Sequence, residues 1–246
     1  MTAERRMRLW RMVVAHAEHG PAAAEHVGAV AVSAAGVDAA AVAVVLDASP
    51  RETIYASDRF AAELEELTLT VGEGPGVDAL ADGPALVADL TAEECLVRWP
   101  VFAPAAAKTG VRAMFALPLR IGAIRLGVLD LYRAEPGGLD AGQVADALVL
   151  ADTIGVLLLD EAERNRSRPD GSWPEHTGAQ HPVVHQATGM VIVQLGVTAA
   201  VALIRLRGYA YANDRRLRDV AADVVARRLR FDADSDVGGS EGLDSG

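Results

Sequence analysis

The sequence has only one cysteine, Cys95, among its 246 residues. One thiol can neither form an intramolecular disulfide nor build a metal site from clustered thiolates, so both are excluded. We interpret Cys95 as a small apolar residue of the core. The sequence also lacks an apolar run of the ~20 residues that a membrane helix needs. Its N-terminus is basic but has no continuous apolar segment and no small-residue cleavage pattern. We therefore expect an amphipathic helix there, not a signal peptide, and a cytoplasmic protein.

Patterns typical of enzymes and metal sites are missing as well. The glycine-rich segment 72–76 has no lysine and no Ser/Thr of a P-loop, and the chain has no Gly-x-Ser-x-Gly elbow. His181 and His185 are four residues apart, but no acid or cysteine nearby completes a metal site. Three acids are interpreted as the solvated face of a helix, not as a catalytic pair: Glu63, Glu65 and Glu66. We expect no catalytic residue, no metal and no enzymatic activity, and the sequence identifies no cofactor.

Charge is distributed unevenly along the chain. The net charge of −11 argues against a general affinity for nucleic acid. Residues 181–231, however, contain eight arginines and three aspartates, a net charge of +5, which leaves −16 for the remainder. This asymmetry predicts a module that faces nucleic acid, joined to an acidic partner domain. A solvated basic face with no nucleic-acid partner is the alternative.

Two segments of low apolar content divide the chain. Residues 164–180 are rich in Pro, Gly, Ser and charge without apolar periodicity, so they are predicted to be a linker. Residues 232–246 are acidic and glycine-rich, which predicts a disordered tail. The expected domains are therefore 1–163 and 181–231.

The N-terminal part mixes helix and strand signals. Helices are predicted over 4–19, 21–34, 59–67, about 99–108 and 140–163, and strands over 39–48, 52–58, 84–90, 111–120 and 123–132. Turn signals at Ser49-Pro50 and Gly122 predict two hairpins. This order predicts an α+β domain in which helices flank an antiparallel sheet.

The first and last helices of this domain carry more apolar surface than a sheet needs. The first has a predicted stripe of Met7, Trp10, Val14 and Ala17. Helix 140–163 is apolar on more than one stripe, whereas a helix that only covers a sheet needs one apolar face. We therefore expect a homodimer, with Leu157 and Leu158 in or beside the contact.

Three motifs resemble the GAF family of actinobacterial regulators over about residues 20–163. They are GEGPGVDAL (72–80), RWPVFAP (98–104) and GVRAMFALPLRIGAIRLGVLDLY (110–132). The resemblance implies a sensor domain. The asparagine-and-lysine signature of cyclic-nucleotide-binding members is missing. A candidate small-molecule pocket is lined by Trp99, Phe102 and Met114, which are equally explained as plain core.

The C-terminal module is predicted to hold three short amphipathic helices, at 182–195, 199–212 and 215–230. Gly196 ends the first and Thr198 caps the second. The arginines lie off the apolar stripes, and arginine suits phosphate because its planar guanidinium makes bidentate contacts. Tyrosine can stack on an unpaired base, although both tyrosines are alternatively core or rim residues. The predicted RNA-binding residues are Arg205, Arg207, Tyr209, Tyr211, Arg215 and Arg216.

The same segment resembles the ANTAR family of RNA-binding domains from transcription antiterminators. The matching residues are Gln186-Ala187-Thr188-Gly189-Met190, Gly196, Ala202, Leu206-Arg207, Ala210, Asn213, Leu217 and Ala221. A lysine often stands in the family where this chain has Thr188, so that phosphate contact is not carried over. The resemblance implies a signal-responsive antiterminator that binds RNA stem-loops in messenger leaders. The alternative is a DNA-binding regulator that uses these helices as a helix-turn-helix.

Overall fold

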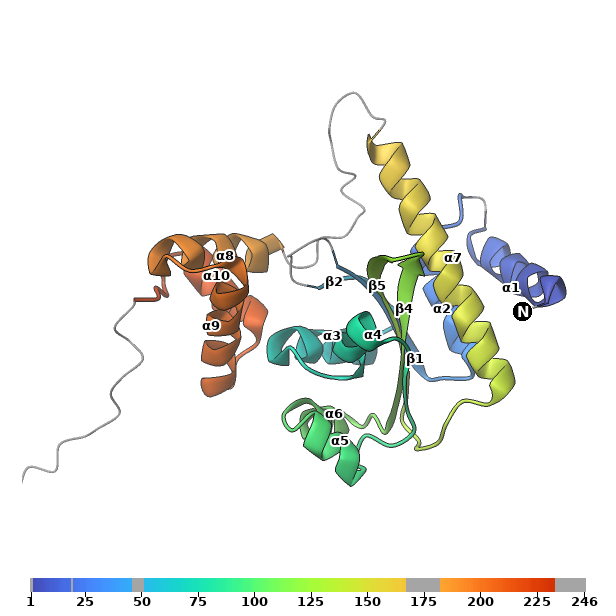
Figure 1. Ribbon diagram of the computed structural model, residues 1–246, viewed down its shortest axis with the longest axis horizontal. Coiled ribbons are helices and arrows are strands. Elements are labelled where there is room, and N and C mark those ends of the chain that lie inside the picture. The colour runs from blue at the N-terminus through green and yellow to red at the C-terminus, as the bar shows by residue number, and fades with distance from the viewer. Residues whose placement is uncertain (1, 19, 46–50, 167–181, 233–246) are drawn as a thin grey trace, which may run out of the picture. The chain divides into compact units, whose positions relative to one another are not determined.

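The computed structural model describes residues 2–18, 20–45, 51–166 and 182–232. The chain divides into two compact units, Met1–Gln180 and His181–Gly246 (Figure 1). Most of the predicted linker and almost all of the predicted tail lie outside the described residues. Residues 164–166 were assigned to the linker, but they continue the last helix of the first unit, because the helical pattern persists through Arg166.

A five-stranded antiparallel sheet with the order β2-β1-β5-β4-β3 forms the centre of the first unit. Its strands are β1 (Ala39–Val44), β2 (Glu52–Ala56), β3 (Ala85–Val87), β4 (Ala113–Ile121) and β5 (Ile124–Arg133). The predicted pairings of β1 with β2 and of β4 with β5 are confirmed. The end of the predicted strand 39–48 lies outside the described residues.

Helices cover both faces of this sheet (Figure 1). One face carries α1 (Ala3–His16), α2 (Ala24–Ala35) and α7 (Ala141–Arg166). The other face carries α3 (Arg59–Val71), α4 (Pro75–Asp82), α5 (Glu93–Arg98) and α6 (Phe102–Thr109). The sequence missed α5, which has six residues and thus too few to show a helical period. The predicted α+β class with helices around an antiparallel sheet is confirmed.

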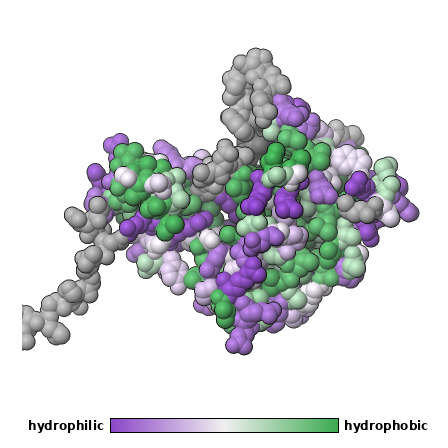
Figure 2. Space-filling view, in the orientation of Figure 1, coloured by the Kyte–Doolittle hydropathy of each residue, from purple (hydrophilic) through white to green (hydrophobic). Residues whose placement is uncertain are grey.

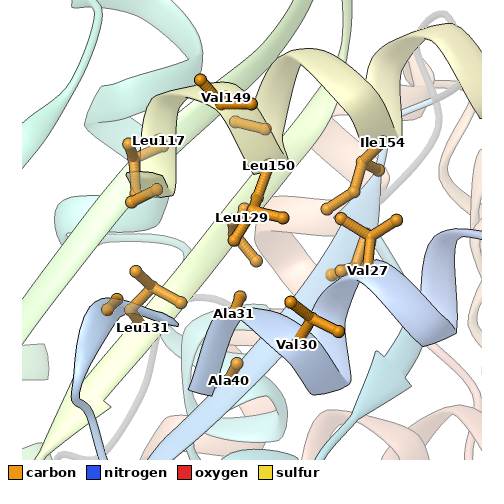
Figure 3. Packing of buried hydrophobic residues seen from close by; sticks show 14 of the residues in the cluster. Val27, Val30, Ala31, Ala40, Leu117, Leu129, Leu131, Val149, Leu150 and Ile154 are labelled. Atoms are coloured by element: carbon orange, nitrogen blue, oxygen red, sulfur yellow. The ribbon is translucent and has the colours of Figure 1, made fainter. Parts of the chain in front are cut away.

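The side chains of β5 alternate between the two faces, as the period of a strand requires. Leu129 and Leu131 pack toward α2 and α7, while Asp130 and Tyr132 face the opposite layer. Figure 3 shows the α2–α7 side, where Leu129 and Leu131 lie close to Ala31 and Leu150. This cluster anchors α7 on the sheet.

Helix α7 is also long and apolar enough to span a membrane over Ala141–Arg164. Core helices of water-soluble proteins share this property. Here Ala147, Leu150 and Ile154 are buried against the sheet layer of the unit. The apolar character of α7 is therefore explained in part by the core that it covers.

Of the predicted apolar stripe of α1, only Ala17 at its end is buried. Leu9 and Val13 enter the core, whereas Met7, Trp10 and Val14 are 54%, 41% and 47% exposed. Both sets have helical spacing, so the sequence pattern alone does not choose between them.

Two ion pairs with α7 help to determine which face of α1 packs against the core. The guanidinium groups of Arg5 and Arg8 lie 2.9 Å and 2.5 Å from the carboxylate oxygens of Asp146 on α7. These contacts belong to the helix face that also buries Leu9, so Met7 and Trp10 are turned outward.

A cluster of charged and hydroxyl side chains is buried between the sheet and α3. Glu65 on α3 accepts hydrogen bonds from Arg51 Nη2 at 2.7 Å, Tyr132 Oη at 2.6 Å and Thr53 Oγ1 at 3.0 Å. Arg51 also pairs with Asp130 on β5. The prediction of a solvated helix face is therefore wrong for Glu65, whose partners come from distant parts of the chain, and also for Glu66, which is buried as well.

The two buried carboxylates share one guanidinium, and their pKa values are shifted in opposite directions. Burial alone would raise the pKa of Glu65, but the charge of Arg51 and hydrogen bonds from Arg51, Tyr132 and Thr53 lower it below its usual range. Burial and the nearby charge of Glu65 raise the pKa of Asp130 to about 7, against the opposing effect of Arg51. Asp130 is therefore the group of the cluster that exchanges a proton near neutral pH.

Two glycines provide a matched test of the packing around the sheet. A Cβ on Gly127 of β5 would lie 2.0 Å from the carbonyl oxygen of Ala43 on β1, whereas a Cβ on Gly155 of α7 has its nearest neighbour at 3.7 Å. We expect Gly127→Ala to lower the free energy of unfolding by about 2 kcal/mol or more. Gly155→Ala should leave it unchanged or raise it by up to about 1 kcal/mol, because alanine favours helix.

Chemical denaturation followed by tryptophan fluorescence measures both variants. Trp10 on α1 and the buried Trp99 both belong to the first unit, and residues 182–232 contain no tryptophan, so these two side chains report the unfolding of the first unit. Equal stability of the two variants would contradict the close approach of the paired strands β1 and β5 at Gly127.

The buried Asp130 makes a specific pH dependence testable. Its pKa in the folded chain, about 7, lies above the unfolded value of 3.8, so the folded state holds the proton more tightly. This contribution to stability is complete below the unfolded pKa and is lost as the pH rises through the folded pKa. From about pH 5 to about pH 8, wild-type stability should therefore fall relative to that of Asp130→Asn. Denaturation followed by tryptophan fluorescence gives the free energy of unfolding of both proteins at each pH. If the two free energies change in parallel with pH, the raised pKa of Asp130 is refuted.

Candidate RNA-binding surface

The second unit contains three helices, α8 (Pro182–Leu195), α9 (Ala199–Ala212) and α10 (Leu217–Val225). The first two have the predicted bounds. The third is shorter than the predicted 215–230, because residues after Ala226 leave the helix through a turn in which Arg227 has φ +58°. The apolar side chains that the helices share are buried at the centre of this unit: Val184, Ala187, Val191, Ala202, Leu206, Ala210, Leu217, Val220, Ala221 and Val224.

Local capping explains the joints between the helices. Gly196 has φ +66°, a left-handed conformation that favours glycine, and it ends α8. The hydroxyl oxygen of Thr198 accepts a hydrogen bond from the Val201 amide at 3.4 Å and caps α9. At the second joint, the Asn213 side chain donates to the carbonyl of Tyr209 at 2.8 Å. The predictions for Gly196 and Thr198 are confirmed, whereas the contact of Asn213 at the end of α9 was not predicted.

The four predicted contact residues on α9 lie on two flanks of the helix. Arg205 and Tyr209 are four residues apart, and so are Arg207 and Tyr211, so each pair shares a flank. The buried stripe that contains Leu206 separates the two pairs. Arg205 and Tyr211 are exposed, whereas Arg207 and Tyr209 are half-buried, and burial lowers the pKa of Arg207. Helix α9 thus does not bring all four together on one face.

Arg215 and Arg216 lie at the joint before α10, and they have different environments. Arg215 Nη2 lies 2.6 Å from Oδ2 of Asp223, whose other carboxylate oxygen is 2.6 Å from Arg228 Nη2. Hydrogen bonds from Arg215 and Arg228 lower the pKa of Asp223. Arg216 is exposed and forms the N-cap position of α10. Arg215 therefore contributes to the structure of the joint, and Arg216 presents its charge to solvent.

The segment after α10 adds Phe231, Arg227 and Arg230 to the basic surface of this unit. Phe231 packs edge-on against Tyr209, with ring centroids 5.6 Å apart, and its amide donates to Oε1 of Gln194 at 3.0 Å. Arg227 and Arg230 line a groove against α8. Predicting a helix through 230 hid these contacts, although the run Arg227-Arg228-Leu229-Arg230 signals a basic surface. Figure 2 shows apolar (green) side chains bordered by hydrophilic (purple) ones on this unit.

The structure brings the three predicted pocket residues of the first unit together. Trp99, Phe102 and Met114 lie in one buried cluster with Tyr132, each at most 3% exposed. The Trp99 indole donates to Oδ2 of Asp78 at 3.1 Å. These side chains occupy the layer between the sheet and its helices, so a ligand there would have to displace them.

Other reactive groups do not form a site among the described residues. Cys95 is buried, its thiol donates to the carbonyl of Asp89 at 3.4 Å, and burial raises its pKa. Within the described ranges, no group of three His, Cys, Asp or Glu side chains could hold a metal ion. His185 is half-buried on α8, and burial lowers its pKa. His181 lies outside the described residues.

Comparison with known proteins bears on both units. Residues 175–225 match the family model of the ANTAR domain, which coincides with most of the three-helix unit. No curated protein shows a significant match to the sequence.

Among solved structures, the first unit is similar to GAF domains. One is the GAF domain from a phosphoenolpyruvate-protein phosphotransferase of Coxiella burnetii, with 15% identity, a TM-score of 0.52, and coverage of 68% of this chain and 99% of that one. Another is the GAF domain from Acinetobacter phosphoenolpyruvate-protein phosphotransferase, with 9% identity, a TM-score of 0.49, and coverage of 66% and 97%. The first of these likenesses shows the fold. The chain therefore has a GAF-plus-ANTAR architecture, with a GAF-fold N-terminal unit followed by a C-terminal ANTAR domain.

Proposed function

We propose that this chain is a signal-responsive, RNA-binding transcription antiterminator. The observation that carries the proposal is the match of residues 175–225 to the ANTAR domain on a three-helix unit rich in arginine. Residues 181–231 have a net charge of +5 in a chain of net charge −11. A local positive charge of this kind supports binding of a polyanion in spite of the acidic remainder.

The RNA targets in this proposal are stem-loops in messenger leaders, whose binding prevents a terminator hairpin from forming. Exposed Arg205 and Arg216 contact phosphates, while Arg215 holds the joint through Asp223 and contributes charge beside them. Tyr211 is exposed and available to stack on an unpaired base. Arg207 and Tyr209, which are half-buried, support the two flanks of α9.

The GAF-fold unit acts as the sensor in this proposal, and its signal is a small molecule. The cluster of Trp99, Phe102 and Met114 is the candidate binding region, and a ligand would bind by displacing these buried side chains next to the polar group of Asp78. Native mass spectrometry of protein purified from its own host would show whether a ligand remains bound. The chain acts in the cytoplasm and has no catalytic activity of its own.

Binding of DNA is a second candidate function, favoured by the geometry of α8 and α9. Their axes differ by 105°, and a short joint at Gly196 connects them. Helix-turn-helix motifs have helices at about 90–120° joined by a short turn that often contains glycine. Gel shifts with an RNA stem-loop and with duplex DNA separate the two functions.

The arginines provide the first test of RNA binding. We expect Arg205→Ala combined with Arg216→Ala to weaken binding of an RNA stem-loop by the full chain. The salt slope should fall by about one unit for each phosphate that the variant no longer neutralises, because each neutralised phosphate releases counterions. Arg59→Ala, an exposed arginine of the first unit, is the matched control and should have little effect. Titrations at several salt concentrations measure both quantities.

The outcome for nucleic acids decides between the two candidate functions. Tighter binding of duplex DNA than of any stem-loop would replace the RNA proposal by the DNA one. The assay includes any ligand found by mass spectrometry. If the folded wild-type chain then binds neither the RNA stem-loop nor the duplex DNA, both candidate functions are refuted.

A homodimer through α1 and α7 is part of the proposal. Met7, Trp10, Val156 and Leu157 line a groove of about 440 Å³ between these helices. Leu157 and Leu158 pack partly against the core of their own unit, so Val156, which is 60% exposed, is the main apolar contribution of α7. A second copy is the expected occupant, since the groove offers both Arg6 and Asp152 for a self-complementary two-fold contact.

The dimer is tested by placing a charge in this groove. Val156→Glu should shift the full chain toward monomer in light scattering, because burying an unpaired carboxylate is costly. Val97→Glu on α5, where the native valine is 77% exposed, is the matched control and should leave the mass unchanged. A wild-type monomer at micromolar concentration, or a dimer unaffected by Val156→Glu, would contradict this contact.

A further inference from the structure

We propose that a groove between α8 and the segment after α10 binds one unpaired nucleotide of the RNA. In this arrangement the base packs on Met190 and Val193, and a phosphate contacts Arg227 and Arg230. The inference rests on the proposed RNA-binding function and names a surface for it that is distinct from the arginines selected from the sequence.

The groove has a suitable size and lining. Its volume is about 550 Å³, within the range of about 300–1,000 Å³ that is common for small-ligand sites. Its lining combines an apolar platform, two amides and two guanidinium groups. The residues that provide them are Met190, Val193, Gln186, Gln194, Arg227 and Arg230.

Helix α8 provides the floor of the groove with the face that it does not bury. Val184, Ala187 and Val191 face the core of the unit, whereas Met190 and Val193 line the groove. Val193 is 84% exposed, so its apolar side chain is accessible to a ligand in the groove. A Cβ added to Gly189 would meet nothing within 4 Å, so the helix backbone is open to close approach here. A flat base fits such a platform.

The turn after α10 forms the basic wall. Arg227 has φ +58°, a left-handed conformation uncommon for residues other than glycine, asparagine and aspartate. Its amide donates to the carbonyl of Val224 at 3.0 Å, and the Leu229 amide donates to the carbonyl of Asp223 at 3.1 Å. Non-glycine residues in this conformation cluster at functional sites. The turn sets Arg227, Leu229 and Arg230 along one groove.

The groove is continuous with one flank of the candidate RNA surface. Gln194 lines the groove and accepts the amide hydrogen of Phe231, which in turn packs on Tyr209. Tyr209 shares a flank of α9 with the exposed Arg205, so an RNA loop bound at Arg205 lies on the flank that these contacts connect to the groove. Amide side chains such as that of Gln186 can donate to and accept from the edges of an unpaired base.

Charge favours a nucleotide over a second copy of this chain as the occupant. Both charged residues of the lining are arginines. A two-fold contact of this surface with itself would place like charges together, which is unfavourable. A phosphate is complementary to the same pair, and arginine binds it through two parallel hydrogen bonds.

The test uses the full chain and an RNA hairpin selected by the wild-type protein from a pool with a random loop. Arg227→Asn removes the guanidinium but keeps a residue that accepts the left-handed turn. Val193→Ser removes the platform at a position that is already exposed. The controls are Arg218→Asn and Ile204→Ser, which make the same kinds of change at exposed positions outside the groove.

We expect Val193→Ser to weaken binding of the hairpin by about tenfold, as for the loss of one stacking contact. Arg227→Asn should weaken it by about tenfold as well, because a charge-assisted contact to a phosphate is lost. Binding of a duplex made from the same stem should be unaffected by Val193→Ser. The two controls should stay close to wild type, and circular dichroism should show all variants folded. A 4-thiouridine in the loop should crosslink to peptides that contain Met190 or Leu229.

Three results would overturn the inference, and they have different meanings. Wild-type affinity in both groove variants, with weakened binding in Arg205→Ala/Arg216→Ala, refutes the groove alone and leaves RNA binding in place. Selection of no hairpin by the wild-type chain refutes RNA binding and the groove together. A change of oligomeric state in Val193→Ser at unchanged RNA affinity assigns the groove to a second copy of the chain.

Discussion

The first unit depends on burying the charge of Arg51 between two carboxylates. Its guanidinium joins the start of β2 to Glu65 on α3 and to Asp130 on β5, so three elements must keep their register together. A buried ion pair adds little stability over an apolar core, but removal of one partner is costly. The cluster also explains Gly76 in the GEGPG segment, because a Cβ there would lie 2.5 Å from Arg51 Nη1. The glycine-rich turn thus serves packing and not phosphate binding.

The sequence predicted the fold where local signals determine it. Helix α8 ends and helix α9 begins where predicted, because Gly196 and Thr198 act on neighbouring backbone groups. It failed where distant partners decide. Glu65 has the spacing of a surface acid, and its burial follows from Tyr132, which is 67 residues away. The face that α1 turns toward the core likewise depends on Asp146, which is 138 residues away from its partner Arg8.

The sequence predicted where the positive charge of the candidate site lies, but not how its side chains are arranged. Composition located the basic module, and the sequence selected Arg205, Arg207, Tyr209 and Tyr211 without separating them into two flanks of α9. It did not show that Asp223 engages Arg215, or that α10 ends at Val225. That early end matters because a continued helix would distribute the last arginines around its axis. The observed turn instead sets Arg227 and Arg230 along α8.

The burial of the only thiol has a practical consequence for spectroscopy. Cys95 is 5% exposed and its raised pKa keeps the thiolate fraction low, so it reacts slowly with alkylating labels at neutral pH. A cysteine introduced on the exposed surface of either unit would therefore be labelled selectively, with the native residue left in place. Pairs of spin labels or fluorophores attached in this way would report the distance between the GAF-fold unit and the ANTAR domain with and without RNA.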